Sequence, residues 1–296
     1  MRGRTYRAHV AVGLVVAWCA GTLAPAAQDR AQEVLARARE AIGGQARLAA
    51  VTSLSVKVSS VRTPLVVIGA GKKPTVRRVT SDLEIQILLP DKLLITRRGP
   101  LGSPQVDGVN GARPIFITGP NVQVVIRDPD FFARMAATRR RQLLRYLVAW
   151  LLVAPESYAV RFSDGGVAAA EGKELNVVEV NGADDFAARL FFDGQSRPVM
   201  ITYQDPPTSA PPTPAPEAKN RDADQPLFKT LEGPTPPPTV TRPRSVRVLL
   251  ADYRADVGIL FPHSMTFESD GQVTETWEIK RFTVNPTLDP RLFEPR

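Results

Sequence analysis

The sequence predicts an α+β fold, in which helices cover a curved antiparallel sheet, a half-barrel of about 10 to 12 strands. Three observations support this prediction. Apolar and polar residues alternate with a period of two in many short segments, Asp, Gly and Pro residues separate these segments, and only two segments have the spacing of a helix. With 296 residues, the chain is long enough for one large β domain.

The clearest strands lie near the end of the chain. In the segment Val273–Lys280 one face carries Val273, Glu275, Trp277 and Ile279, and the other is polar. The segments Leu260–Phe267 and Ser245–Arg254 precede it, and an Asp-Gly pair at 270–271 suits a tight hairpin turn. These three segments predict an antiparallel meander.

Further strands are expected upstream, where the same alternation recurs. A hairpin is expected around Pro90-Asp91, and a second one around the turn at 193–196. The predicted strands are Ser53–Val61, Arg78–Leu89, Lys92–Arg98, Ala112–Thr118, Val122–Arg127, Tyr158–Phe162, Asn176–Val180, Arg189–Phe192 and Pro198–Tyr203.

Two helices are predicted from apolar spacing and end signals. The first has Asp29 as its N-cap and ends at Gly43-Gly44. The second has Asp128 as its N-cap and Pro129 at its first position, and runs to Val153. Its second half, Leu143–Val153, is apolar on nearly every side, so we expect it to lie against an apolar partner.

The first 26 residues have the pattern of a Sec-type signal peptide. Three arginines precede the apolar run Val10–Ala20, and small residues at 24–26 offer a cleavage site. The apolar run is too short to span a bilayer, and no second candidate follows it. Cleavage would remove the only cysteine, Cys19. We therefore expect an exported, periplasmic protein without a disulfide, a Cys nucleophile or a transmembrane span.

Removal of the three leader arginines lowers the formal net charge from +8 to +5. This modest excess suits an anionic membrane surface or lipid headgroup, and nucleic acid is not an expected partner of an exported chain. No nucleophile or zinc-protease signature occurs, and His263 is the only histidine after the leader. We expect no enzymatic activity, no catalytic residue, no metal site and no cofactor.

A proline-rich stretch, Asp205–Pro243, interrupts the strand pattern. It holds 12 of the 27 prolines and has almost no apolar periodicity, which predicts a disordered segment. A linker between two domains would have the same composition. The roughly 50 residues beyond it are too few to close a separate core. We therefore expect one domain, 27–296, with an insertion at 205–243 between neighbouring strands.

Seven apolar residues are candidates for the wall of a lipid cavity, although the sequence fits ordinary core packing equally well. Three consecutive arginines in the second helix form either a solvated face or a contact for an anionic ligand or membrane. The cavity candidates are Leu143, Leu147, Trp150, Leu151, Phe191, Phe267 and Trp277, and the anionic-contact candidates are Arg139, Arg140 and Arg141.

Several segments together resemble the outer-membrane lipoprotein carrier superfamily, the LolA/LolB-like half-barrels of the periplasm. They are the helix Ala31–Gly44 leading into Leu54-Ser55-Val56, the hairpin Leu190–Asp193 to Arg197–Val199, the hairpin Asp252–Arg254 to Gly258–His263, and the ending Val284–Phe293. The resemblance implies a hydrophobic cavity between sheet and helices that shields acyl chains. It maps no lipoprotein-release residue onto this sequence.

Two functions follow as hypotheses. The first is an exported, non-enzymatic carrier that binds a lipid or an acylated protein in an apolar cavity. The alternative is an envelope sensor or adaptor that binds another protein through the sheet or the proline-rich segment.

Overall fold

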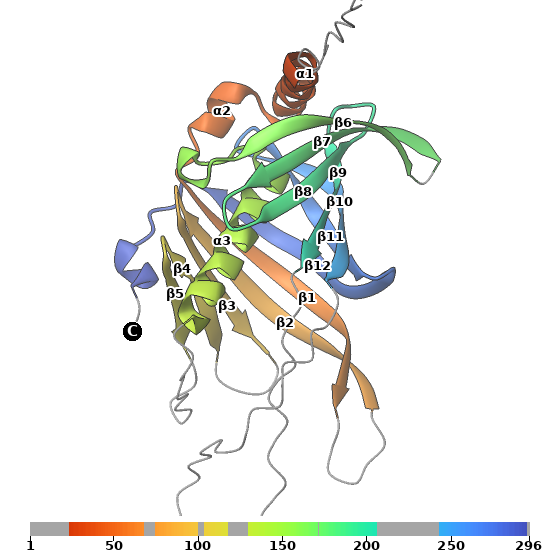
Figure 1. Ribbon diagram of the computed structural model, residues 1–296. Coiled ribbons are helices and arrows are strands. Elements are labelled where there is room, and N and C mark those ends of the chain that lie inside the picture. Colours follow the sequence, from red (N-terminus) through yellow and green to blue (C-terminus); the bar gives the residue numbers. More distant parts are fainter. Residues whose placement is uncertain are drawn as a thin grey trace, which may run out of the picture.

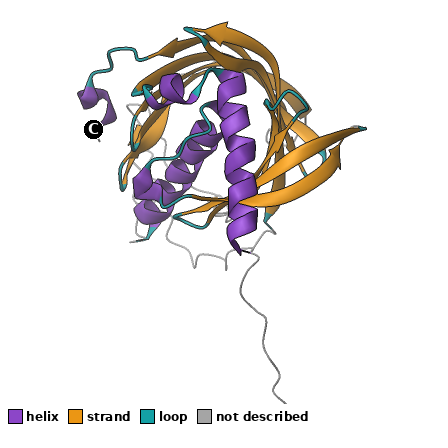
Figure 2. Cartoon of the chain, turned by 90° about the horizontal axis from the view of Figure 1, so that it is seen from above, coloured by secondary structure: helices purple, strands orange, loops and turns teal. Residues whose placement is uncertain are grey.

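The computed structural model describes residues 24–67, 75–99, 104–117, 130–170, 172–205 and 243–294. Within these residues, 12 strands form one antiparallel sheet in the order β5-β4-β3-β2-β1-β12-β11-β10-β9-β8-β7-β6. Figure 2 shows the sheet curving around the helices. The predicted α+β half-barrel is therefore confirmed.

The strands make two meanders, β1 to β5 and β6 to β12, which join where β1 pairs with β12. Since β1 comes early in the chain and β12 comes last, this pairing joins the two ends of the sequence into one sheet (Figure 1). The strands are β1 (Ser53–Val67), β2 (Thr75–Leu88), β3 (Lys92–Arg98), β4 (Gln105–Asn110), β5 (Arg113–Ile117), β6 (Arg161–Ala170), β7 (Lys173–Gly182), β8 (Phe186–Phe192), β9 (Pro198–Asp205), β10 (Arg244–Asp256), β11 (Ile259–Ser269) and β12 (Gln272–Val284).

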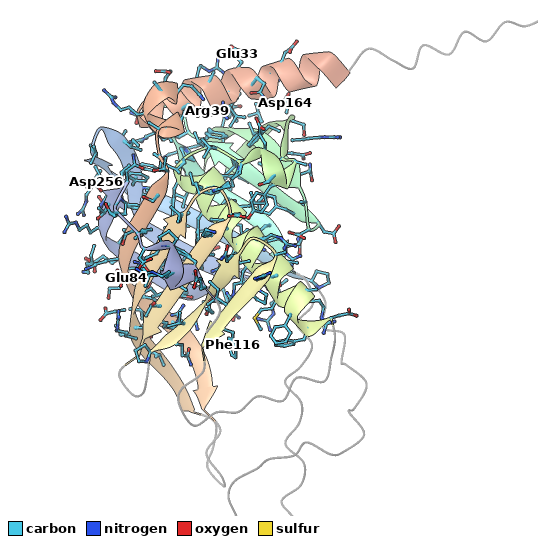
Figure 3. The ribbon with its side chains drawn as sticks, turned by 90° about the vertical axis from the view of Figure 1, so that its left-hand side faces the viewer. Glu33, Arg39, Glu84, Phe116, Asp164 and Asp256 are labelled. Atoms are coloured by element: carbon cyan, nitrogen blue, oxygen red, sulfur yellow. The ribbon has the colours of Figure 1, made fainter. Side chains whose placement is uncertain are left out.

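The longest helix, α3 (Phe131–Trp150), runs along the concave face of the sheet and packs against β3, β4, β5 and β8. The N-terminal helix α1 (Ala24–Ile42) lies across one end of the half-barrel (Figures 1 and 3). It packs against β6, β7 and β11, and the short helix α2 (Gln45–Ala49) follows it. On α1, Arg30 lies 3.5 Å from Asp164 of β6, and Arg39 donates to the carbonyl oxygen of Leu152, 3.0 Å away.

Gly43 and Gly44 end α1, as predicted. Gly43 has φ 148° and Gly44 has φ 91°, values that side chains other than glycine rarely adopt. A Cβ atom on Gly43 would lie 2.9 Å from the carbonyl oxygen of Gly258, so only glycine lets the chain pass this close to the β10–β11 turn. The predicted N-cap is wrong, because α1 begins at Ala24 and contains Asp29.

The main core lies between the concave face, α1 and α3. From α1 it takes Val34, Leu35 and Ile42, and from α3 the apolar second half. A smaller cluster on the outer face packs Leu94 and Ile115 against Phe293. Phe293 belongs to the C-terminal 3₁₀ helix η2 (Pro290–Phe293), which therefore covers part of the outer face.

Three local predictions fail. The sequence predicts a strand at Tyr158–Phe162, but Tyr158 ends the 3₁₀ helix η1 (Glu156–Tyr158) and β6 begins at Arg161. Strand β4 and most of β6 were not expected from the sequence. In β6 the reason is its glycine and alanine residues, which favour strands weakly. Tertiary contact overrides that preference, since β6 pairs with β7 and lies under α1. Finally, α3 ends at Trp150 rather than Val153, as Leu152 has φ 54°.

Several predicted features lie outside the described residues. They are the strand Val122–Arg127, the N-cap Asp128, most of the leader and most of the proline-rich insertion. The insertion's flanking strands are described, however: β9 ends at Asp205, β10 begins at Arg244, and these two residues are register partners.

Candidate functional site

A cavity of about 920 Å³ lies between one side of α3 and the concave face of the sheet. Side chains from β9, β10, β11 and β12 form one part of its wall, and Arg62 of β1 and Arg97 of β3 close another part. Asp205 and Arg244, where β9 ends and β10 begins, also line it. Its volume lies in the upper part of the range of about 300 to 1,000 Å³ for small-molecule sites.

The apolar part of the wall comes from the sheet and from one face of α3. The Phe267 and Trp277 rings lie 4.7 Å apart, and the Tyr146 ring lies 6.1 Å from Trp277. These rings form one continuous apolar surface. The apolar and aromatic lining residues are Phe131, Met135, Ala137, Tyr146, Ala149, Ile201, Tyr203, Val248, Met265, Phe267 and Trp277.

The polar part of the wall is positively charged. Seven arginines line the cavity against four carboxylates, an excess of three positive charges among the described lining residues. The arginines are Arg62, Arg97, Arg134, Arg139, Arg141, Arg145 and Arg244, and the carboxylates are Asp184, Asp185, Asp205 and Glu275. The cavity wall therefore combines an apolar surface with a positively charged one.

Glu275 of β12 is the centre of the polar network in the cavity wall. Its Oε1 accepts hydrogen bonds from Ser60 Oγ and from Trp277 Nε1 at 2.8 Å. Arg62 Nε lies 3.0 Å from Oε2, and an Arg97 guanidinium nitrogen lies 3.4 Å from Oε1. Burial alone would raise the pKa of Glu275, but the donated hydrogen bonds and the two arginines outweigh it and lower that pKa. One ionised carboxylate therefore faces two guanidinium groups.

A second carboxylate, Asp107 of β4, lies near the same arginines. Arg139 of α3 approaches its Oδ1 to 3.2 Å and donates to Gln142 Oε1 at 2.7 Å. Burial raises the pKa of Asp107, although Arg139, Arg97 and Arg62 each act to lower it. Burial and the charge of Arg62 also lower the pKa of Arg97. The site thus crowds three guanidinium groups around two carboxylates, one of which is drawn toward its neutral form.

On its other side, α3 forms ion pairs and hydrogen bonds with the turn between β7 and β8 and with the end of β9. Arg140 makes a bidentate pair with Asp184, at 2.6 and 2.5 Å. Arg141 donates to the Asp184 carbonyl oxygen at 2.9 Å. Arg145 pairs with Asp205 at 2.7 Å and lies over the Tyr203 ring, 3.6 Å from its centre. These contacts hold α3 against the sheet on that side of the cavity.

No protein-family model matches this chain, and no curated protein matches it in sequence. Similar solved structures include a LolA superfamily protein from Nitrosomonas europaea, with 11% identity and a TM-score of 0.47 over 89% of this chain and 97% of that chain. A putative outer membrane lipoprotein-sorting protein domain from Vibrio parahaemolyticus has 10% identity and a TM-score of 0.38 over the same shares.

A chain of the Pseudomonas aeruginosa MucA/MucB complex has 12% identity and a TM-score of 0.21, over 87% of this chain and 100% of that chain. The chain resembles LolA superfamily proteins. The similar solved structures thus include the superfamily that the sequence resembles. At these identities and TM-scores, the similarity assigns no ligand and no partner to this chain.

The structure separates the seven residues predicted as cavity wall into three groups. Phe267 and Trp277 line the cavity. Leu143, Leu147, Trp150 and Leu151 are at most 1% exposed, belong to the main core and are not among the lining residues. Phe191 lies in a separate cluster with Leu175, Val177 and Met200. The cavity therefore faces another side of α3, which runs from Phe131 to Ala149 along most of the helix.

The three predicted anionic contacts also differ in their surroundings. Arg139 and Arg141 line the cavity, whereas Arg140 is not among the lining residues and pairs with Asp184. Sequence reasoning did not select Arg62, Arg97, Tyr203 or Glu275. A signal for Glu275 was present, because a carboxylate between Val273 and Trp277 on the apolar face of a strand needs polar partners. Nothing in the sequence placed Arg62 and Arg97 beside it.

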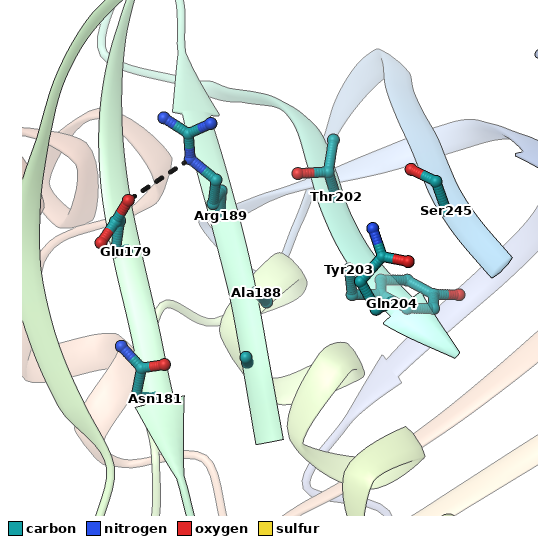
Figure 4. A pocket seen from close by; sticks show the side chains of 9 residues that line it. Glu179, Asn181, Ala188, Arg189, Thr202, Tyr203, Gln204 and Ser245 are labelled. Atoms are coloured by element: carbon teal, nitrogen blue, oxygen red, sulfur yellow. Dashed lines mark ion pairs between the residues drawn. The ribbon is translucent and has the colours of Figure 1, made fainter. Parts of the chain in front are cut away.

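A second, shallower depression of about 280 Å³ lies over β7 to β10 (Figure 4). Polar residues such as Thr202, Gln204 and Ser245 line it, and Arg189 lies 3.6 Å from Glu179 at its edge. It is smaller than the usual small-molecule site.

Among the described residues, no group of three potential metal ligands comes together. His263 is buried, with Nδ1 3.1 Å from the Phe261 carbonyl oxygen and Nε2 3.5 Å from Asp256. In the part of the chain that the structure describes, no helix is long and apolar enough to cross a membrane.

Proposed function

We propose that this protein is an exported, periplasmic binding protein that holds the apolar chain of a lipid or an acylated protein in the cavity between α3 and the sheet. It carries its ligand and does not transform it. The observation that supports this proposal is the cavity of about 920 Å³ with a continuous aromatic and aliphatic wall. Binding by such a wall needs burial of apolar surface and no reacting group.

The construction of α3 supports the same function. Leu143, Leu147 and Trp150 on one side of α3 are buried in the core and fix the helix, while another side, from Phe131 to Ala149, lines the cavity. A helix anchored in this way keeps an apolar surface open that would otherwise collapse onto the sheet. At about 25 cal/mol per Å², burying an acyl chain against such a surface contributes several kcal/mol of binding free energy.

The test is to purify the mature protein without detergent, extract it with solvent and identify bound lipid by mass spectrometry. Delipidated protein is then titrated with a fluorescent fatty acid. We expect copurified lipid and saturable, one-site binding. Phe267→Ala should weaken binding, because Phe267 forms part of the cavity wall. Phe191→Ala is the matched control, since Phe191 lies in a different cluster.

Other outcomes would contradict the carrier proposal or favour the alternative function. A delipidated protein that binds no fatty acid, or equal weakening by Phe267→Ala and Phe191→Ala, would contradict the carrier proposal. A stable protein partner recovered together with an empty cavity would favour the envelope sensor or adaptor.

A further inference from the structure

The described part of the cavity contains a polar subsite made of three guanidinium groups, those of Arg62, Arg97 and Arg139. They come from three elements, β1, β3 and α3, that lie far apart in the sequence. All three line the cavity, with side chains 44%, 18% and 27% exposed. The group is therefore partly sheltered from water and still open to a ligand.

Among the described residues, these three side chains use only part of their capacity to donate hydrogen bonds. Each guanidinium has five N–H donors. Among the described residues, Arg62 and Arg97 share one carboxylate, Glu275, and Arg139 reaches Asp107 and Gln142. Two carboxylates thus face three cations. An uncompensated cation in a sheltered wall is costly unless an anion joins it.

The surroundings of the three arginines fix where such an anion would sit. Glu275 also accepts a hydrogen bond from Trp277, whose ring packs on Phe267 in the apolar wall. Arg139 contacts Gln142, which donates to the Tyr146 hydroxyl at 2.9 Å, and the Tyr146 ring belongs to the same wall. The charged subsite is therefore continuous with the apolar surface. A ligand lying on Phe267 and Trp277 would bring its polar end to the arginines.

We propose that the cavity selects amphiphiles with an anionic headgroup, and that Arg62, Arg97 and Arg139 bind the phosphate or carboxylate of that headgroup while Phe267 and Trp277 hold the chain. This inference rests on the proposed function and adds the chemical class of the ligand. Glu275 competes with the headgroup for Arg62 and Arg97 in this arrangement, so it limits the affinity for the anion.

Two probes with one acyl chain separate headgroup from chain. 1-Oleoyl lysophosphatidic acid carries a phosphate, and 1-oleoylglycerol does not. Both compete with a fluorescent fatty acid for the delipidated mature protein, below their micelle concentrations. We expect the phosphate probe to bind roughly tenfold to a hundredfold more tightly, as charge-assisted hydrogen bonds would give. Oleic acid as a third probe reports whether a carboxylate serves as well as a phosphate.

Variants of the arginines and of Glu275 should change the affinity for the phosphate probe in opposite directions. Arg97→Gln and Arg139→Gln should each weaken the phosphate probe by about tenfold and leave 1-oleoylglycerol unchanged. Glu275→Gln should strengthen the phosphate probe, because it frees two guanidinium groups, a gain that no damaged fold would give. Arg189→Gln is the matched control, since Arg189 pairs with Glu179 beside the shallow depression. Melting curves accompany each variant, and Arg139→Gln serves if Arg97→Gln does not fold.

Three outcomes would overturn the inference. Equal affinity of the wild type for both probes would leave the carrier function intact and remove the anionic selectivity. Equal weakening of both probes by the arginine variants would assign these residues to structure alone. Absence of binding by either probe would refute the carrier function together with the subsite.

Discussion

Leu147 of α3 provides a direct test of which side of this helix belongs to the core and which side lines the cavity. Its side chain is fully buried in the main core and does not line the cavity. Leu147→Ala removes three carbons, one methine and two methyls, from a site with no access to solvent, and such changes cost about 2 to 5 kcal/mol. At about 2 to 4 °C per kcal/mol for a protein near this size, the melting temperature should fall by about 4 to 20 °C.

The assay combines thermal unfolding, followed by circular dichroism, with displacement of a fluorescent fatty acid at a temperature where both proteins are folded. We expect a lower melting temperature and an unchanged fatty-acid affinity. Leu147→Trp should also destabilise the protein, by about 1 to 3 kcal/mol or more, because a fully enclosed site has no room for the larger ring. Phe267→Ala should give the reverse pattern, with a smaller stability loss and weaker binding, since Phe267 lines the cavity.

This reasoning is refuted if Leu147→Trp keeps the wild-type melting temperature and blocks fatty-acid binding. That result would place Leu147 on the cavity wall, as the sequence pattern allowed. A Leu147→Ala protein that melts like the wild type would show that α3 does not pack on the sheet as described.

Three further predictions concern charge and chain connectivity. Burial raises the pKa of Tyr146, Tyr158, Tyr203 and Tyr253 above 10, and to about 12 for Tyr158 and Tyr203. The stability of the protein should therefore fall as pH rises past 10, and phenolate absorbance should appear together with unfolding. Early, stepwise ionisation in folded protein would contradict this. The pKa of Glu275 is lowered, so its contribution to stability is present above about pH 4.5 and is lost as pH falls through its folded pKa. The melting difference between wild type and Glu275→Gln should therefore shrink in acid, and a constant difference would argue against the ion network. Replacing residues 206–242 by a short Gly-Ser turn should change the melting temperature little, because β9 and β10 already pair at Asp205 and Arg244 and loop-closure entropy grows slowly with length; a cooperative loss of structure in that variant would show that the segment is packed.

The sequence alone determined the fold class and most strand positions. Alternation in Val273–Lys280 and the turn at Asp270-Gly271 depend on local geometry, which a strand imposes whatever it packs against. The two glycines that end α1 acted in the same local way, since only the backbone angles at that point require them. Local rules failed where tertiary contact overrode them, as in β6, where pairing with β7 outweighs a glycine- and alanine-rich composition.

Only the tertiary structure decided which apolar residues form a cavity and which form core. Leu147 and Phe267 are equally apolar in sequence, and their difference depends on the angle of α3 and on which sheet residues face it. The charged subsite is a still longer-range property. Arg62, Arg97, Arg139 and Glu275 meet because β1 pairs with β12 and α3 crosses the concave face, so residues up to 213 positions apart share a hydrogen bond. Sequence patterns record the period of each element, whereas these contacts depend on how the elements are placed together in space.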